Sequence, residues 1–221
     1  MTTLTTVPMA PLLERLFAQD DALSVDTLPA ARALTPEEQQ RLMQSKTDYI
    51  ALYSQLKTLP LAVSRKTGAL LYMLARSCKA RHIVEFGTSF GISTLHLAAA
   101  LKDNGGGRLI TTEFEADKVR IAHRNLTEGG VDALVEIREG DALQTLRSGL
   151  PEHIDLLLLD GAKALYPEIL ALITPHLKPG ALVIADDANM SPEYLAQVRN
   201  PQAGWLSVPF ADDVELSLRI Q

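Results

Sequence analysis

Apolar and polar positions follow two different periodic patterns along this chain, and together these patterns predict the fold. From Leu61 to about residue 200, short apolar runs alternate with helical stretches, as expected for strands that alternate with helices. Two runs, Leu156–Leu159 and Leu182–Ile184, are apolar at consecutive positions, which is typical of strands covered on both faces of a parallel sheet. The tail alternates apolar and polar residues and predicts an antiparallel hairpin. The expected strands cover residues 82–86, 108–112, 134–137, 154–159, 181–185, 206–210 and 214–220.

Turn residues support these boundaries. Glycines close two predicted helices, at 104–107 and at 129–130, and Pro179-Gly180 leads into the last parallel strand. Repeated strand–helix units that end in a hairpin are typical of an α/β fold. We therefore expect a Rossmann-like, doubly wound, mostly parallel seven-stranded sheet with helices on both faces, a C-terminal antiparallel hairpin and an added N-terminal helical segment.

Residues 1–60 are expected to form a helical arm or cap, followed by a domain that covers residues 61–221. Thr35-Pro36-Glu37-Glu38 carries the signature of a helix start, with a cap residue, a proline at the first helical position and a glutamate three residues after the cap. The predicted helix runs from Pro36 to about Lys57. It either covers the binding pocket or forms a dimer surface, and we favour a homodimer.

Composition narrows the functional classes. Of the 221 residues, 47% are hydrophobic and 22% charged, as in ordinary globular proteins. The 21 basic and 27 acidic residues give a formal charge of −6, which disfavours nucleic acid as the main partner. The single Cys78 excludes an internal disulfide, and no segment approaches the roughly 20 apolar residues of a membrane span. These features predict a cytoplasmic protein that acts on a small molecule and has no membrane partner.

A glycine-containing turn follows the first predicted strand. In Glu85-Phe86-Gly87-Thr88-Ser89-Phe90-Gly91, an acid stands two residues before the first glycine, and a second glycine stands four residues after it. This spacing does not match the Gly-x-Gly-x-x-Gly turn of dinucleotide-binding proteins. Glycines at this end of an open α/β sheet let the backbone approach a ligand closely, and the helix that follows offers unpaired N–H groups to an anion.

Polar residues also stand at the ends of the next two strands. Glu113 ends the second strand, where an acid can accept hydrogen bonds from ribose hydroxyls. Asp141 and Ala142 follow the third strand, where they can meet an adenine edge. Each feature has a structural alternative: a turn glycine, a solvated strand-end acid or a helix-capping aspartate. Three such features in order at successive strand ends favour a nucleoside site.

Charged residues stand at the ends of the fourth and fifth strands. Asp160 ends the fourth, with Lys163 three residues later, and Asp186 and Asp187 end the fifth. Carboxylates that converge at one edge of a sheet raise each other's pKa unless a cation joins them, and oxygen ligands suit Mg²⁺, Ca²⁺ or Mn²⁺. We therefore predict a divalent metal site of Asp160, Asp186 and Asp187. The alternative is that Asp160 and Asp186 cap helices and Lys163 lies on the surface.

In these segments the chain resembles the S-adenosylmethionine-dependent O-methyltransferases of the catechol and caffeoyl-CoA O-methyltransferase type, the bacterial branch included. The resemblance covers about three quarters of the chain, from about Leu61 onward, and it rests on VEFGTSFGISTLHLA, LITTEFE, EGDAL, LLLLDGAK and LVIADD in the family order. It implies that Ser93 contacts the methionine carboxylate and Glu113 the ribose. The full set implied to bind S-adenosyl-L-methionine is Glu85, Gly87, Gly91, Ser93, Glu113, Phe114, Asp141, Ala142 and Asp160.

The resemblance also implies the chemistry, which is transfer of a methyl group from S-adenosylmethionine to a hydroxyl of a small phenolic or catechol-like acceptor. Lys163 and Asp160 are the implied catalytic residues, with Lys163 as a general base whose pKa is depressed by the metal and by burial. One departure is that Asp186-Asp187 stands where the family usually has Asp-Asn, so a metal complex here carries one more negative charge. Two alternatives are that Asn189 is the ligand in a reshaped loop or that the metal is absent.

Two other functions stay open at this point. The first is a non-catalytic S-adenosylmethionine-binding module that acts through a partner. The second is a nicotinamide-dependent oxidoreductase on the same layout, against which the missing Gly-x-Gly-x-x-Gly argues.

Overall fold

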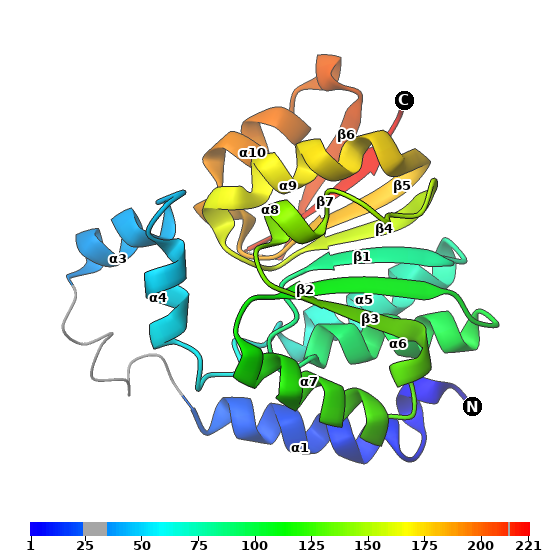
Figure 1. The fold of residues 1–221 in the computed structure, drawn as a ribbon. Helices are drawn as coiled ribbons and strands as arrows, with labels where there is room; N and C mark the ends of the chain where they lie inside the picture. Colours follow the sequence, from blue (N-terminus) through cyan, green and yellow to red (C-terminus); the bar gives the residue numbers. More distant parts are fainter. Residues whose placement is uncertain (24–34, 212) are drawn as a thin grey trace.

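The computed structural model describes residues 1–23, 35–211 and 213–221, and it confirms the predicted α/β architecture. The strands are β1 (His82–Phe86), β2 (Arg108–Glu113), β3 (Val135–Glu139), β4 (Ile154–Leu159), β5 (Leu177–Ala185), β6 (Trp205–Phe210) and β7 (Val214–Arg219). They form one seven-stranded sheet in the order β3-β2-β1-β4-β5-β7-β6 (Figure 1). The first five strands are parallel, and β7 pairs antiparallel with both β5 and β6, which is the predicted hairpin.

Helices cover both faces of the sheet (Figure 1). They are α1 (Met9–Asp21), α3 (Pro36–Met43), α4 (Tyr49–Gln55), α5 (Arg65–Ser77), α6 (Ile92–Asp103), α7 (Ala116–Glu128), α8 (Ala142–Thr145), α9 (Tyr166–Ile173) and α10 (Pro192–Val198). Helices α5, α6 and α7 pack on one face, and α8, α9 and α10 pack on the other. None of the helices in the described ranges has the length and apolarity needed to cross a membrane.

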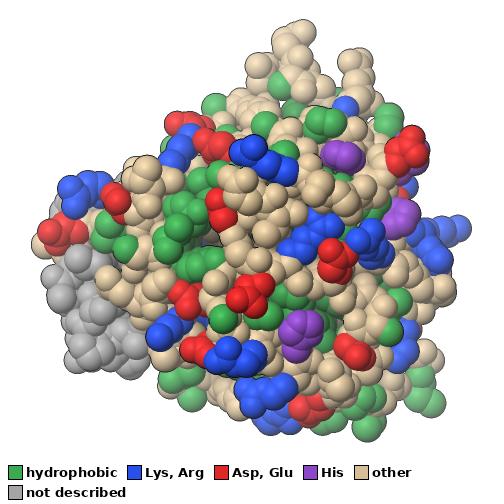
Figure 2. Space-filling model, in the orientation of Figure 1, with side chains coloured by type: hydrophobic (Ala, Val, Ile, Leu, Met, Phe, Trp, Pro, Cys, Tyr) green, Lys and Arg blue, Asp and Glu red, His purple; other side chains and the backbone are tan. Residues whose placement is uncertain are grey.

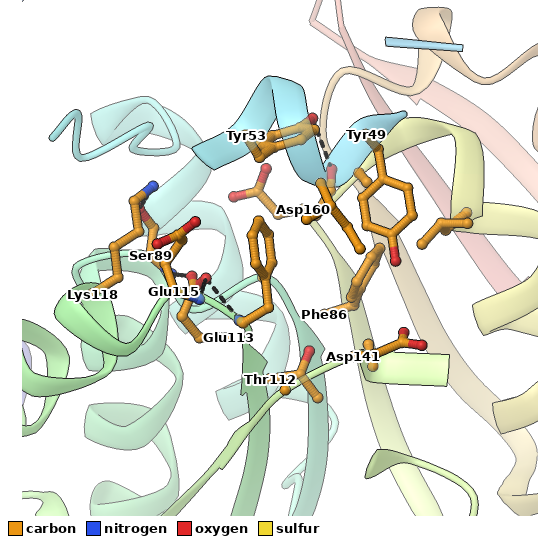
Figure 3. Close-up of a pocket in the computed structure, with 18 of the residues that line it drawn as sticks. Tyr49, Tyr53, Phe86, Ser89, Thr112, Glu113, Glu115, Lys118, Asp141 and Asp160 are labelled. Carbon is orange, nitrogen blue, oxygen red and sulfur yellow. Dashed lines mark hydrogen bonds between the residues drawn. The ribbon is translucent and has the colours of Figure 1, made fainter. Parts of the chain in front are cut away.

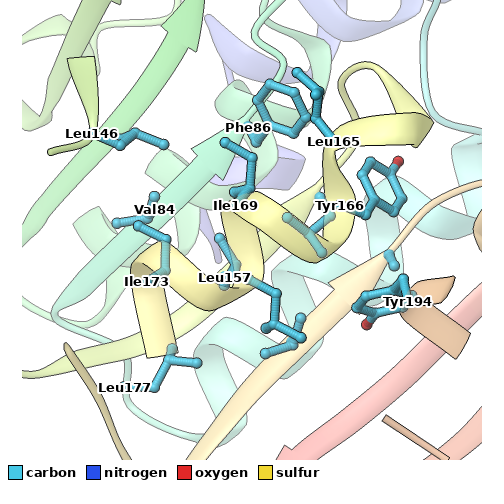
Figure 4. Close-up of a cluster of buried hydrophobic side chains, with 14 of the residues drawn as sticks. Val84, Phe86, Leu146, Leu157, Leu165, Tyr166, Ile169, Ile173, Leu177 and Tyr194 are labelled. Atoms are coloured by element: carbon cyan, nitrogen blue, oxygen red, sulfur yellow. The ribbon is translucent and has the colours of Figure 1, made fainter. Parts of the chain in front are cut away.

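The consecutive leucines of β4 are buried because each face of the sheet has its own helical layer. Leu157 and Leu159 join the cluster around α9 and α10, where Tyr166 and Tyr194 are the largest fully buried side chains (Figure 4). Leu156 and Leu158, which point the other way, pack with α5 and α6. Side chains alternate across a strand, so a strand between two helical layers needs apolar residues at every position.

Strand β5 begins at Leu177, four residues before the start expected from the sequence. Its first part contains Pro179 and Gly180, the pair expected to lie just before the strand. Gly180 has a φ of +84°, and the register between β4 and β5 shifts between Ile154 and Leu156. An irregularity of this kind lets a strand continue through residues that ordinarily interrupt one.

The prediction of a single helix from Pro36 to about Lys57 is wrong. The structure has two shorter helices, α3 and α4, over this stretch. The predicted start is confirmed: the Glu38 N–H donates to Thr35 Oγ1 at 3.2 Å, and the Thr35 N–H donates to Glu38 Oε2 at 2.9 Å. Between the helices, Ser45 Oγ accepts the N–H groups of Thr47 and Asp48 at 3.3 and 3.0 Å. A serine that satisfies nearby backbone donors in this way favours a turn over a continuous helix.

Helix α1 belongs to the core and differs in this respect from the two helices that follow it. Its five buried side chains, Met9, Leu12, Leu13, Leu16 and Phe17, share one cluster with residues of α6 and α7. Helices α3 and α4 lie instead beside the carboxyl ends of the strands (Figure 1). The domain boundary at residue 60 stays a prediction.

The backbone just after β1 lies close to the backbone just after β4 at Gly87. The Asp160 N–H donates to the Phe86 carbonyl at 2.8 Å, and Gly87 follows with a φ of +106°. A Cβ at Gly87 would lie 2.5 Å from the carbonyl oxygen of Asp160. This contact requires glycine for two separate reasons, the positive φ and the lack of space.

We expect Gly87→Ala to destabilise the fold more than Gly180→Ala. Gly180 also has a positive φ but has nothing within 4 Å of its Cβ position, so its variant measures the conformational cost alone, roughly 1–2 kcal/mol. The clash at Gly87 adds about 1–3 kcal/mol to that cost. Urea unfolding of both variants measures the difference, and equal losses would show that the β1–β4 contact is not tight.

Candidate functional site

The carboxyl ends of β1, β2 and β4 open into a cavity on which α4 lies (Figure 3). The space between its walls, open mouth included, is about 780 Å³, which falls within the roughly 300–1,000 Å³ of small-molecule sites. Figure 2 shows hydrophobic side chains gathered where α4 meets the rest of the chain, with acidic side chains around them. The lining residues include Tyr49, Tyr53, Phe86, Gly87, Ser89, Glu113, Phe114, Glu115, Lys118, Asp141, Ala142 and Asp160.

Glu113 ends β2, as predicted, and its carboxylate is held by backbone donors. Its Oε2 accepts the N–H of Ser89 at 2.9 Å, and its Oε1 accepts the N–H groups of Phe114 and Glu115 at 2.9 and 3.0 Å. Three N–H donors fix the position of this acid in the cavity wall. Each carboxylate oxygen accepts more than one hydrogen bond, so Glu113 can also receive the hydroxyls of a ligand.

The turn after β3 places Asp141 and Ala142 in the cavity wall, and Phe114 lines the cavity from the end of β2. Asp141 accepts the N–H of Leu143 at 2.9 Å and so caps α8. The capping alternative considered for this residue is therefore correct, and it does not remove the residue from the cavity. Phe114, Ala142 and Asp141 thus place an aromatic ring, a methyl group and a carboxylate in the cavity wall. These groups suit a flat heterocycle with polar edges.

Three residues expected to contact a cofactor lie beneath the cavity wall. Glu85, Gly91 and Ser93 are not among the lining residues. Ser93 Oγ donates to Glu85 Oε1 and Thr94 Oγ1 donates to Glu85 Oε2, each at 2.6 Å. Burial raises the pKa of Glu85 to about 7, although the hydroxyls of Ser93 and Thr94 act in the opposite direction. This buried group ties the start of α6 to β1 and supports the turn above it.

Lys163 stands between two carboxylates after β4. Its Nζ donates to Asp160 Oδ1 at 3.1 Å and lies 3.3 Å from Asp187 Oδ2. The side chains of Lys163 and Asp160 are only 8% and 11% exposed, whereas that of Asp187 is 40% exposed. The alternative of a surface lysine is therefore wrong, and Asp160 provides no helix cap, since the short helix after it begins behind Ala162.

The neighbours of Lys163 in the chain shift its pKa upward, and the depression expected from a bound metal stays a prediction. Burial disfavours the ammonium form, but the polar and charged groups of Tyr166, Asp160, Tyr53 and Asp187 outweigh this effect and raise the pKa of Lys163 well above its ordinary value. Burial raises the pKa of Asp160. The two groups therefore form a buried ion pair in which the lysine keeps its proton.

The metal site expected after β4 and β5 stays a prediction. Across residues 1–23, 35–211 and 213–221, no three His, Cys, Asp or Glu side chains are grouped so that they could hold a metal ion. Of the predicted set of Asp160, Asp186 and Asp187, two members have the ammonium of Lys163 next to them. A lysine in this position already supplies the positive charge that the carboxylates require.

Sequence reasoning missed the aromatic and basic residues that complete the cavity. Tyr49 and Tyr53 are four residues apart on α4 and both line the cavity, and Tyr53 Oη donates to the Gly161 carbonyl at 3.5 Å. Ser89 and Lys118 line the opposite side near Glu113 (Figure 3). The spacing of the tyrosines was a usable signal, because residues four apart share one helix face. Lys118 had no such signal.

Comparisons with known proteins agree with this geometry. Residues 84–188 match the family model of a methyltransferase domain. The catechol O-methyltransferase of Niastella koreensis is 35% identical over 130 residues, 58% of this chain and 58% of that protein. The catechol O-methyltransferase of Mycobacterium tuberculosis is 32% identical over 127 residues, 58% of this chain and 57% of that protein. The match thus spans less than two thirds of the length of these curated relatives.

A solved structure shares the fold over nearly the whole chain. The O-methyltransferase TomG of Streptomyces achromogenes, involved in tomaymycin synthesis and solved in complex with SAM, has a TM-score of 0.63 and 25% sequence identity. The similarity covers 95% of this chain and 99% of that one. The predicted resemblance to S-adenosylmethionine-dependent O-methyltransferases of the catechol type is confirmed.

We expect Glu85 to make stability depend on pH. Its folded pKa of about 7 lies above the ordinary 4.5, so the folded protein binds this proton more tightly than the unfolded chain. The resulting stabilisation is complete below pH 4.5 and is lost as the pH rises through 7. Glu85→Gln should therefore gain about 1–3 kcal/mol relative to the unmodified protein between pH 5 and pH 8. Urea unfolding across this range measures the gain, with the exposed Glu152→Gln as control, and a difference independent of pH would contradict the prediction.

Proposed function

We propose that this chain binds S-adenosylmethionine at the carboxyl ends of β1, β2 and β4 and transfers its methyl group to a hydroxyl of a small phenolic or catechol-like acceptor. The observation that carries the proposal is the buried pair of Lys163 and Asp160, whose carboxylate lines the same cavity as Glu113. A nucleoside site and a charged pair suited to an oxygen nucleophile thus share one cavity. The match of residues 84–188 to a methyltransferase domain supports this assignment.

The cavity residues suit the parts of S-adenosylmethionine. Glu113 would accept the ribose hydroxyls, and Phe114, Asp141 and Ala142 would enclose the adenine. When bound, the sulfonium supplies an electrophilic methyl group. Asp160 would face this positive charge from the end of β4. Glu85, Gly91 and Ser93 would support the binding turn from below, and their own contact with the cofactor stays a prediction.

Lys163 and Asp160 have different proposed roles toward the hydroxyl of the acceptor. A lysine that keeps its proton does not remove one from a hydroxyl, so we assign to Lys163 the electrostatic stabilisation of the developing oxyanion. Asp160 would receive the proton, because burial makes its carboxylate a stronger base than an exposed one. The general-base role that the resemblance implies for Lys163 passes in this proposal to Asp160.

A divalent cation is not part of this mechanism. Among the described residues no three His, Cys, Asp or Glu side chains are grouped to hold one, and Lys163 stands beside Asp160 and Asp187. The carboxylate of Asp187 gives the lysine a second partner. The chain's own ammonium therefore provides the positive charge near the acceptor oxygen.

Aromatic side chains on the α4 side of the cavity favour a flat acceptor. Tyr49 and Tyr53 come from α4, and Phe86 from the end of β1 (Figure 3). Ring faces of this kind pack against planar apolar molecules. A phenol or catechol has the required shape and carries the hydroxyl to be methylated. Homodimer formation and a cytoplasmic location stay predictions from the sequence.

A methyl-transfer screen tests the proposed function directly. We expect labelled S-adenosylmethionine to pass its methyl group to at least one phenol or catechol, at the same rate in Mg²⁺ and in EDTA, because the positive charge is part of the chain. Cofactor binding without any methylated product would favour the non-catalytic module. Turnover that stops in EDTA and returns with Mg²⁺ would show that the lysine does not take the place of a metal.

Lys163→Met should lower kcat by about 10²–10³-fold, because it removes a positive charge next to the reacting oxygen in a buried site. Calorimetry should show unchanged affinity for S-adenosylhomocysteine, since Glu113 and the adenine pocket stay intact. Lys178→Met is a matched control, because Lys178 pairs with Asp155 at the opposite end of β4. Full turnover in Lys163→Met would exclude Lys163 from the mechanism.

A further inference from the structure

A second cavity lies where α1 and the short helix Thr3–Thr5 meet α5 and α6. The space between its walls, open mouth included, is about 890 Å³, which is a size typical of small-molecule sites. Apolar side chains form much of the wall, among them Leu4, Leu13 and Phe17, and His96 lies in it as well. None of its described lining residues lines the cavity at the strand ends. The second cavity is therefore separate from the proposed methyl-transfer site.

His96, on α6, brings a buried hydrogen-bond acceptor to this cavity. Its Nδ1 lies 2.8 Å from the Ile92 carbonyl, which can only accept, so Nδ1 carries a proton. Burial lowers the pKa of His96, which is 4% exposed, and the ring is therefore neutral. A neutral ring with its proton on Nδ1 has a lone pair on Nε2. Nε2 forms no hydrogen bond with any residue in the ranges 1–23, 35–211 and 213–221.

Gly68, on α5, leaves space beside Nε2 of His96. Glycine destabilises the interior of a helix relative to alanine, and Gly68 has no positive φ that would require it. A Cβ at this position would lie 2.8 Å from both Nε2 and Cε1 of His96. The absence of a side chain at Gly68 therefore serves the imidazole ring, at the edge that carries the lone pair.

The cation of the second cavity already has acidic partners. Arg65 donates to Glu14 at 3.1 Å and lies 3.5 Å from Asp21, and its guanidinium carbon stands 4.5 Å from the centre of the Phe17 ring. Because two acids neutralise Arg65, the cavity does not require an anionic ligand. The group that lacks a partner among the described residues is a buried, neutral acceptor. A complementary ligand has an apolar body and one hydrogen-bond donor.

We propose that the second cavity binds a small, mainly apolar molecule whose hydroxyl group donates a hydrogen bond to Nε2 of His96. Leu4, Leu13 and Phe17 would pack against the apolar body of this molecule. A hydroxyl suits the position because it donates without carrying a charge, whereas an ammonium would share the cavity with the guanidinium of Arg65. The inference does not depend on methyl transfer at the strand ends.

Cyclohexanol and its methyl ether test this proposal, because only the alcohol has a donor. NMR titrations would follow the methyl signals of Leu4 and Leu13 and the ring nitrogens of His96, so that binding elsewhere is not counted. Cyclohexanol should bind about 3–10-fold more tightly than the ether, as expected for one neutral hydrogen bond. The Nε2 signal should move upfield with cyclohexanol alone, because this nitrogen then accepts a hydrogen bond. An unchanged Nε2 signal, or equal affinity for both probes, would overturn the proposal.

Variants at the two facing positions extend the test. His96→Phe keeps an aromatic ring without an acceptor, so it should bind both probes with the affinity that the unmodified protein has for the ether. Gly68→Ala should lower the affinity for cyclohexanol toward the same value, since its Cβ occupies the space next to Nε2. His123→Phe replaces an exposed histidine and should leave both affinities unchanged.

Thermal unfolding of each variant checks that it is folded. A folded His96→Phe that binds cyclohexanol as tightly as the unmodified protein would exclude His96 as the group that recognises the hydroxyl. If His96→Phe does not fold, the Nε2 signal of the unmodified protein and its preference between the two probes decide the question.

Discussion

The close packing of β1 against β4 at their carboxyl ends is the contact on which the rest of the site depends. Gly87 leaves room for the carbonyl of Asp160, and the ring of Phe86 occupies the space next to Gly161 that a side chain there would need. Glycine on both strands thus brings the turn after β1 beside the acid that ends β4. Any side chain at Gly87 would push apart the two walls that face the ligand.

The partners of the buried charged groups determine which of these groups can also bind a ligand. Three N–H groups hold Glu113, two hydroxyls hold Glu85, and Lys163 holds Asp160. Because an ion loses its hydration on burial, each of these partners is a requirement of the fold as much as of the site. Glu85 is fully engaged and lies out of reach, whereas Glu113 and Asp160 keep oxygen atoms on the cavity.

The N-terminal residues divide into a structural part and a part that shapes the cavity. Helix α1 buries five apolar side chains against α6 and α7 and so completes one face of the domain. Helix α4 brings Tyr49 and Tyr53 to the cavity and is tied to it through Ser54, which donates to Glu115. Segments outside the sheet can change while the strand ends stay as they are. Acceptor preference is therefore expected to depend on α4, and nucleoside binding on the sheet.

The sheet and the strand-end residues Gly87, Glu113, Asp141 and Asp160 could be predicted from the sequence. These features depend on local periodicity and on the rule that parallel strands present their carboxyl ends at one edge. The partners of the charged groups could not be predicted, because they depend on distances of a few ångströms between segments far apart in the chain. In the folded chain, Lys163 forms an ion pair with Asp160 where a metal site was expected. Ser93 donates to the buried Glu85, and Lys118 lines the cavity. Burial and neighbouring charge, which set the pKa of each group, exist only once those segments have come together.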